Sequence, residues 1–166
     1  MIAKARHHLR DSPEHNRTLY HSIFSSHMIY GCLSWFIVEN QYTKKIKVLQ
    51  NNALRLITFA ESFRDHITPT YKDLKILKIE DHVTMEHLLL VHDYLNGKLP
   101  SSFNGYFTLI REQYGQGTRA AQSDKLFLPS TDTVRYGTHS IRIKAIQSWN
   151  EFITKHRTVS VSYTHL

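Results

Sequence analysis

The chain has 166 residues, with 21 Lys and Arg against 14 Asp and Glu, a formal net charge of +7 at pH 7 that favours an anionic partner such as nucleic acid. No stretch approaches the roughly 20 consecutive apolar residues of a membrane span, and the N-terminus MIAKARHH lacks the apolar core of a signal peptide. We therefore expect an intracellular protein, in the cytoplasm, the nucleus or both, with no membrane partner.

The first predicted helix begins at Ser12-Pro13 and runs to about Tyr30. Serine is a favoured N-cap, and proline is tolerated at the first helical position. Apolar residues recur along it at helical spacing, at Leu19, Tyr20, Ile23, Phe24 and Met28. Gly31 then provides a break. The apolar run 32–38 fits either a strand or a buried helix, and both remain open.

A second predicted helix runs from a Thr43 cap to residues 58–60, and its two faces differ. The predicted buried stripe comprises Tyr42, Ile46, Leu49, Ala53, Leu56 and Ile57. At 100° per residue the opposite side gathers basic and polar residues, namely Lys44, Lys47, Asn51, Arg55 and Thr58. Such a side can offer charge to phosphates, or it can simply be the solvated surface of a helix.

Two further helices are predicted before residue 100, and the composition of the chain changes after it. A short helix restarts at Thr68-Pro69, and the next begins at an Asp81 cap and ends at Asn96-Gly97. Its predicted buried positions are Val83, Thr84, Leu88, Val91 and Leu95. Beyond residue 100 glycine and polar residues separate isolated aromatics, a short strand is expected at 140–143, and a short helix follows around Trp149.

These elements predict a mainly α protein. We expect a small bundle of about four helices over residues 1–100 and an irregular, extended segment over residues 101–166, which contains the short strand and the short final helix. Large aromatics such as Trp35, Trp149 and Tyr30 suit a core, and they could also stack on bases.

The sequence offers no catalytic or metal-binding pattern. His82, His87 and His92 are five apart, so their side chains diverge on a helix by about 140° instead of sharing one ion. The only cysteine, Cys32, excludes an internal disulfide and a Cys-based zinc cluster. Glu80-Asp81 is the only adjacent acidic pair, and its place at a helix start favours capping. We expect no enzyme activity of this chain alone, no cofactor, no metal and no small-molecule substrate.

Several blocks, in order, resemble the region after the catalytic palm in reverse transcriptases of non-LTR retrotransposons, the LINE-like elements of the jockey and related groups. The first block is matched by Tyr20, Tyr30, Gly31 and Trp35, and the second, a Gln-Asn-x-Ala-x-Arg-x-Ile helix, by Gln50, Asn51, Ala53, Arg55 and Ile57. The third is matched by Thr68, Pro69, Tyr71, Leu74, Ile76, Leu77, Leu99 and Pro100, and the last by Thr118, Arg119, Leu126, Leu128, Pro129, Ser140, Arg142, Trp149 and Asn150. The chain departs from the family at Phe36, where the family has glycine, and at Ala145-Ile146, where it has Gly-Pro.

The resemblance implies a thumb and post-thumb fragment of an RNA-directed DNA polymerase. It implies that the palm, with the acidic residues that hold Mg²⁺, lies upstream in the parent polyprotein and is a missing partner of this chain. The implied ligand is the backbone of an RNA–DNA or DNA duplex. The candidate nucleic-acid-binding residues are Lys44, Lys47, Asn51 and Arg55. The tail TVSVSYTHL does not continue the family pattern, and we interpret it as a truncation or a foreign ending.

Two alternatives stay open. The same amphipathic helices could form a stand-alone interaction module, in which the charge only keeps the protein soluble. The chain could also be a decayed, non-functional fragment of an element.

Overall fold

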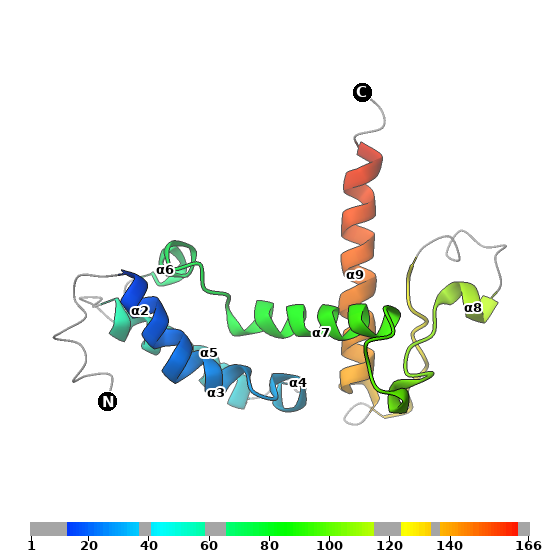
Figure 1. Ribbon diagram of the computed structural model, residues 1–166, viewed down its shortest axis with the longest axis horizontal. Helices are drawn as coiled ribbons and strands as arrows, with labels where there is room; N and C mark the ends of the chain where they lie inside the picture. Colours follow the sequence, from blue (N-terminus) through cyan, green and yellow to red (C-terminus); the bar gives the residue numbers. More distant parts are fainter. Residues whose placement is uncertain (1–12, 37–40, 59–65, 115–123, 134–136, 163–166) are drawn as a thin grey trace. The chain divides into compact units, whose positions relative to one another are not determined.

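The computed structural model describes residues 13–36, 41–58, 66–114, 124–133 and 137–162 (Figure 1). The chain divides into two compact units, Met1–Val83 and Thr84–Leu166. The division falls within a helix, whereas the change in composition that set the predicted boundary lies at residue 100. The described residues are mainly helical, as predicted, and they contain one isolated β-bridge, between Leu109 and Leu126, and no longer strand.

The first unit begins with a continuous helical run. It consists of α2 (Pro13–Leu19), the π-helical η1 (Tyr20–Ser25) and α3 (Ser26–Ile29). The predicted break at Gly31 is confirmed, because this residue has a φ of +63°, which glycine adopts without steric cost. After it, α4 (Cys32–Trp35) shows that the start of the ambiguous run is helical. Ser12, the predicted cap, lies outside the described residues.

Helix α5 (Gln41–Ile57) packs against this run and against the segment around α6 (Thr68–Asp73). Leu54 is fully buried there, together with Ala53 and Ile57. The predicted stripe is wrong at Leu49, which is 55% exposed. Two polar residues, Thr43 and Gln50, are buried in its place, so the buried side of α5 is rotated from the one that hydrophobicity alone indicates.

Gln50 joins three parts of the first unit through its side-chain amide. Its Nε2 donates to the Tyr20 hydroxyl at 2.8 Å and to the Leu77 carbonyl at 2.9 Å, while its Oε1 accepts the Ile79 N–H at 3.0 Å. The last bond satisfies a backbone donor at the start of α7 (Ile79–Leu95), where no intrahelical partner exists. Helix α7 therefore begins two residues before the predicted Asp81 cap, and Asp81 lies in its first turn.

Helix α7 ends as predicted, at a glycine. Gly97 has a φ of +65° and donates its N–H to the Tyr94 carbonyl, and Lys98 donates to the Asp93 carbonyl. This pair of bonds is the Schellman arrangement. Of the predicted buried positions in α7, Val83 and Val91 are buried, whereas Thr84 and Leu95 are exposed and His87 is buried instead.

The second unit packs an irregular chain against α7 and α9 (Ile141–Ser162). Two short helices, η2 (Ser101–Phe103) and α8 (Ile110–Tyr114), interrupt that chain. Its core residues are Val91, Phe107, Leu109, Leu126, Ala145 and Ile146. The irregular segment is therefore held by buried apolar side chains that come from it and from the two helices.

The predicted strand at 140–143 is wrong, and the final helix is longer than predicted. Ser140 is the N-cap of α9, because its Oγ accepts the N–H of Ile143 at 3.4 Å. The alternation of Ile141 and Ile143 resembles a strand only over these few residues. Ile143, Ala145 and Ile146 are all buried, which is the spacing of a helix packed on one side.

His87 gives the second unit a pH-dependent stability. Burial, and secondarily the charge of Lys144, lowers the pKa of its imidazole below the ordinary value of 6.5. The imidazole of His87 therefore binds a proton more readily in the unfolded chain than in the folded unit. Its contribution to the stability of the folded unit is complete above about pH 6.5 and is lost as the pH falls through the lowered pKa. We expect His87→Leu to unfold with a weaker pH dependence between pH 7 and 5, measured by urea titration. His156→Gln, at an exposed site, is the control, and equal pH dependence in both variants would contradict the assignment.

Candidate nucleic-acid interface

The structure places the four predicted nucleic-acid-binding residues along α5 in the first unit, in different surroundings. Lys44 is exposed. Lys47 is half-buried and forms an ion pair with Glu80 of α7. Asn51 accepts a hydrogen bond from the Tyr71 hydroxyl at 2.8 Å. Arg55 is half-buried and donates from Nη1 to the Asn52 Oδ1 at 3.4 Å.

Tyr71 of α6 interacts with two residues of this set, Asn51 and Arg55. Its side chain is buried, and burial, with the nearby Tyr20 and Glu80, raises the pKa of its hydroxyl, which therefore stays protonated and donates to Asn51. The ammonium of Lys78 lies 5.8 Å from the centre of its ring. The α6–α7 segment thus engages Lys47 and Asn51, and these two side chains are partly committed to the fold.

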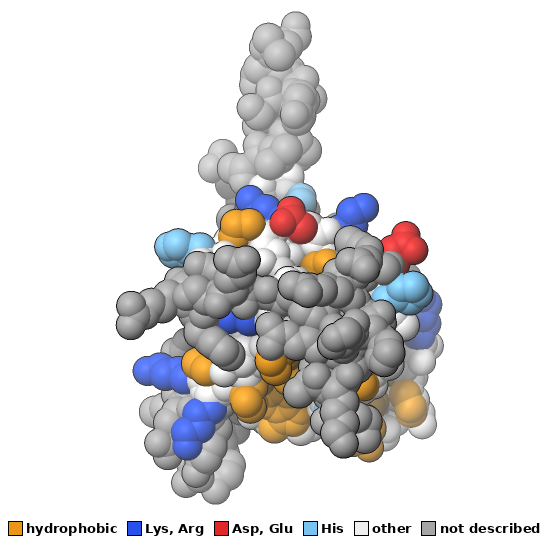
Figure 2. Space-filling model, turned by 90° about the vertical axis from the view of Figure 1, so that its left-hand side faces the viewer, with side chains coloured by type: hydrophobic (Ala, Val, Ile, Leu, Met, Phe, Trp, Pro, Cys, Tyr) orange, Lys and Arg blue, Asp and Glu red, His pale blue; other side chains and the backbone are white. Residues whose placement is uncertain are grey.

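Sequence reasoning missed a second group of cations next to this helix. Lys72, in the last turn of α6, is followed at every third residue by Lys75 and Lys78 before α7 begins, and all three are exposed. The signal was present as a regular lysine spacing, but the segment was treated only as a connection between helices. In Figure 2, the Lys and Arg side chains that are visible between the grey residues lie apart from one another, and exposed hydrophobic side chains lie on the same face.

Both units are basic over the full sequence. Residues 1–83 hold 12 Lys and Arg against 8 Asp and Glu, and residues 84–166 hold 9 against 6. Lys44, Arg55, Lys72 and Lys78 are defined here as the cationic set of the first unit. Counterion release by such side chains gives sequence-independent, salt-sensitive binding to phosphates.

Several residues of the blocks that carry the family resemblance make hydrogen bonds within the fold. Gln50 and Tyr20 bond each other, as do Asn51 and Tyr71. In the second unit, Trp149 donates its indole N–H to the Asp124 carbonyl at 2.8 Å, and Asn150 bonds both backbone groups of Leu126. In the first unit, residues of different blocks therefore meet in pairs, whereas Asn150 and Leu126 belong to the same block.

The three aromatic residues that could stack on bases differ from one another in exposure. Trp35 donates its indole N–H to the Tyr30 carbonyl at 3.1 Å and is half-buried, as is Trp149. Tyr30 is 86% exposed, so a core role is wrong for it. It is the member of the three whose ring surface is open to a ligand.

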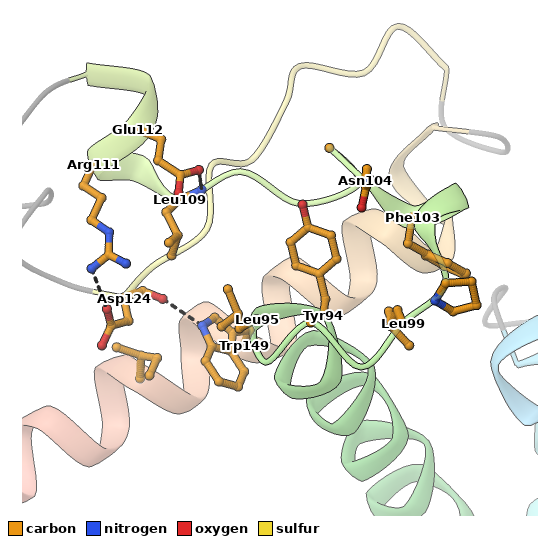
Figure 3. Close-up of a pocket in the computed structure, with 14 residues that line it drawn as sticks. Tyr94, Leu95, Leu99, Phe103, Asn104, Leu109, Arg111, Glu112, Asp124 and Trp149 are labelled. Atoms are coloured by element: carbon orange, nitrogen blue, oxygen red, sulfur yellow. Dashed lines mark hydrogen bonds and ion pairs between the residues drawn. The ribbon is translucent and has the colours of Figure 1, made fainter.

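A pocket in the second unit has a volume of about 820 Å³ (Figure 3). Tyr94, Phe103 and Trp149 contribute aromatic surface to it, and an ion pair between Arg111 and Asp124, at 3.4 Å, lies at one side. The Glu112 carboxylate also lines it and accepts the Leu109 N–H, which places a second negative charge there. This balance of charge does not favour a phosphate.

Within the described residues, no three His, Cys, Asp or Glu side chains gather as they would to hold a metal ion. No helix in the described ranges is long and apolar enough to cross a membrane. Comparison of the chain with protein-family models, with curated proteins and with solved structures finds no match.

Proposed function

We propose that the chain binds the phosphate backbone of nucleic acid, as the thumb-side fragment of a non-LTR retrotransposon reverse transcriptase. The observation that carries the proposal is the cationic set itself, in which Lys44, Lys72 and Lys78 are exposed and Arg55 is half-buried, on α5 and from α6 to the start of α7. The ordered resemblance of the blocks from Tyr20 to Asn150 supports the family. On this proposal the catalytic palm and its Mg²⁺ belong to the parent polymerase, and this chain contributes to binding of the template-primer duplex.

The cationic set is the part of the surface that would contact phosphates. Lys44 lies on α5, and Lys72 and Lys78 flank the α6–α7 connection, so the contacts would come from two elements. Lys47 contributes less than the sequence predicts, because Glu80 already neutralises it. Asn51 contributes through its engagement with Tyr71, which fixes α6 against α5, more than through direct binding.

Salt-dependent binding tests this function. We expect the chain to bind an RNA–DNA duplex at 50 mM salt with an affinity that falls steeply by 200 mM, measured by fluorescence anisotropy. The triple variant Lys44→Ala, Lys72→Ala, Lys78→Ala should bind more weakly. Its slope of log K against log salt should be smaller by up to about 3, one for each phosphate that a lysine no longer neutralises.

The matched control replaces Lys98, Lys125 and Lys155 of the second unit by alanine. It removes the same charge, so an equal loss of affinity in both variants would mean that the whole chain acts through its net charge only. Absence of duplex binding by the unmodified chain at 50 mM salt would overturn the proposal.

A second candidate is a stand-alone interaction module, and one observation favours it. Val48 and Leu49 are adjacent on α5 and are each 55% exposed, although apolar side chains on a helix usually pack. A protein partner that covers them would explain both exposures. In that case Val48→Ser with Leu49→Ser would leave the fold intact and abolish binding of that partner.

A further inference from the structure

A small cavity in the first unit collects donors and a positive charge without any carboxylate. Its volume is about 170 Å³, and it lies between the η1–α3 run, α5 and the chain that follows α6. Its polar lining comes from Tyr20, His21, Ser25, Gln50, Lys75 and His82. No Asp or Glu is among the described residues that line it. An anion is therefore the charge type that this cavity would accept most readily.

Lys75 occupies a backbone position where glycine is favoured. It has a φ of +52°, and the bonds Lys75 N–H to Lys72 O and Ile76 N–H to Tyr71 O form a Schellman arrangement at the end of α6. The same arrangement at the end of α7 has Gly97 in the equivalent position. A lysine in the left-handed region is strained, and such strain is typical of positions whose side chain has a function.

Two hydroxyl groups on the cavity wall have hydrogen-bonding capacity to spare. Ser25 is 6% exposed, and its side chain makes no hydrogen bond within the described part of the chain. The Tyr20 hydroxyl accepts an N–H from Gln50, so its own proton remains available, with no acceptor among the described residues. Buried hydroxyls usually have their bonds satisfied, and these two instead line an open space.

We propose that this cavity binds a phosphate group, with the Lys75 ammonium as its counter-charge and the hydroxyls of Ser25 and Tyr20 as donors. The volume of about 170 Å³ is several times the roughly 10 to 15 Å³ of cavity space that one water molecule needs, so a group of five heavy atoms fits. Burial and Arg17 lower the pKa of His21, so at neutral pH its imidazole is a neutral hydrogen-bonding group at the site. Because the cavity is small, it suits inorganic phosphate or the terminal phosphate of a chain better than an internal diester.

The test measures binding of inorganic phosphate to the full chain by isothermal titration calorimetry. The unmodified chain should bind phosphate, and Lys75→Gly should lose that binding while raising the thermal midpoint of the phosphate-free protein by about 4 to 8 °C, because glycine relieves the strain at this position. Ser25→Ala should weaken binding about tenfold. Lys98→Ala removes an exposed lysine that belongs neither to the cavity lining nor to the cationic set, and it should bind phosphate normally.

Two further arms identify the source of the phosphate. Tighter binding of a 5′-phosphorylated oligonucleotide than of its 5′-hydroxyl form, lost in Lys75→Gly, would assign the site to nucleic-acid ends, whereas equal binding of both would assign it to free phosphate. The cavity proposal does not rest on the cationic set, so phosphate binding without duplex binding supports it while the proposed function fails. No phosphate binding at millimolar concentration, or unchanged binding in Lys75→Gly, overturns it.

Discussion

Replacing Gln50 with leucine should lower the free energy of unfolding of the first unit by about 3 to 5 kcal/mol. Leucine matches glutamine in size, but it can serve neither the Leu77 carbonyl nor the Ile79 N–H. Each buried backbone group left without a partner costs about 1 to 3 kcal/mol. The Tyr20 hydroxyl also loses the N–H that it accepts, 2.8 Å away. Because the amide of Gln50 makes two bonds as donor and one as acceptor, no apolar side chain replaces it.

Urea denaturation followed by circular dichroism measures this effect. Asn52→Leu is the matched control, since Asn52 lies on the same helix and, among the described residues, its side chain hydrogen-bonds only Arg55, at 3.4 Å. We expect the control to change stability by less than about 1 kcal/mol. If Gln50→Leu lowers the free energy of unfolding by no more than the control does, the network around Gln50 is not a main source of stability.

The helices of this chain could be predicted because residues at the helix ends themselves determine where the helices begin and end. Pro13, Gly31 and Gly97 mark a beginning, a break and an end, and each acts through its own backbone preference. The same local logic failed at Ser140. A cap there was overlooked because Ile141 and Ile143 alternate, and a helix of 22 residues was interpreted as a strand followed by a short helix.

The buried side of α5 could not be predicted from hydrophobicity. Leu49 and Gln50 are neighbours, and a hydrophobicity pattern necessarily buries the leucine. The glutamine is buried instead because Tyr20 and the segment of Leu77 and Ile79 are both distant in sequence and present groups that only an amide satisfies. Such a preference is visible only once the partners are in place.

The sequence predicts that the candidate site is positively charged, but it does not predict which of the cations form ion pairs. The basic character of Lys44 and Arg55 follows from the sequence, but Glu80, which neutralises Lys47, lies 33 positions away along the chain. Lys75 was missed for a different reason. Its significance depends on a positive φ, which no sequence pattern indicates for lysine.

Asn150 is expected to be as important for the second unit as Gln50 is for the first. Its Oδ1 accepts the Leu126 N–H at 2.8 Å, and its Nδ2 donates to the Leu126 carbonyl at 2.9 Å, so one side chain pairs both backbone groups. On the neighbouring residues, Phe127 N–H bonds the Thr108 carbonyl and Ile110 N–H bonds the Lys125 carbonyl. Asn150 therefore fixes the segment around Leu126 to α9, while the opposite edge of that segment pairs with the chain around Leu109.

Asn150→Leu should cost about 2 to 4 kcal/mol, because both backbone groups of the fully buried Leu126 lose their partner. Asn150→Asp is more informative, since an ionised carboxylate keeps the acceptor and cannot donate to the carbonyl. Repulsion from that carbonyl should raise the pKa of the new carboxyl in the folded unit. Its penalty is then present above that pKa and is relieved as the pH falls, when the protonated acid donates again.

Urea titrations at pH 7 and pH 4 would separate these effects, with each variant compared with the unmodified chain at the same pH. Asn104→Asp introduces the same charge at an exposed site of the second unit and should show little difference between the two conditions. If the deficit of Asn150→Asp is independent of pH, the donor to the Leu126 carbonyl is not what holds the segment. The stability of the second unit would then rest on the apolar packing of Leu126, and Leu126→Ala would become the more destabilising of the two substitutions.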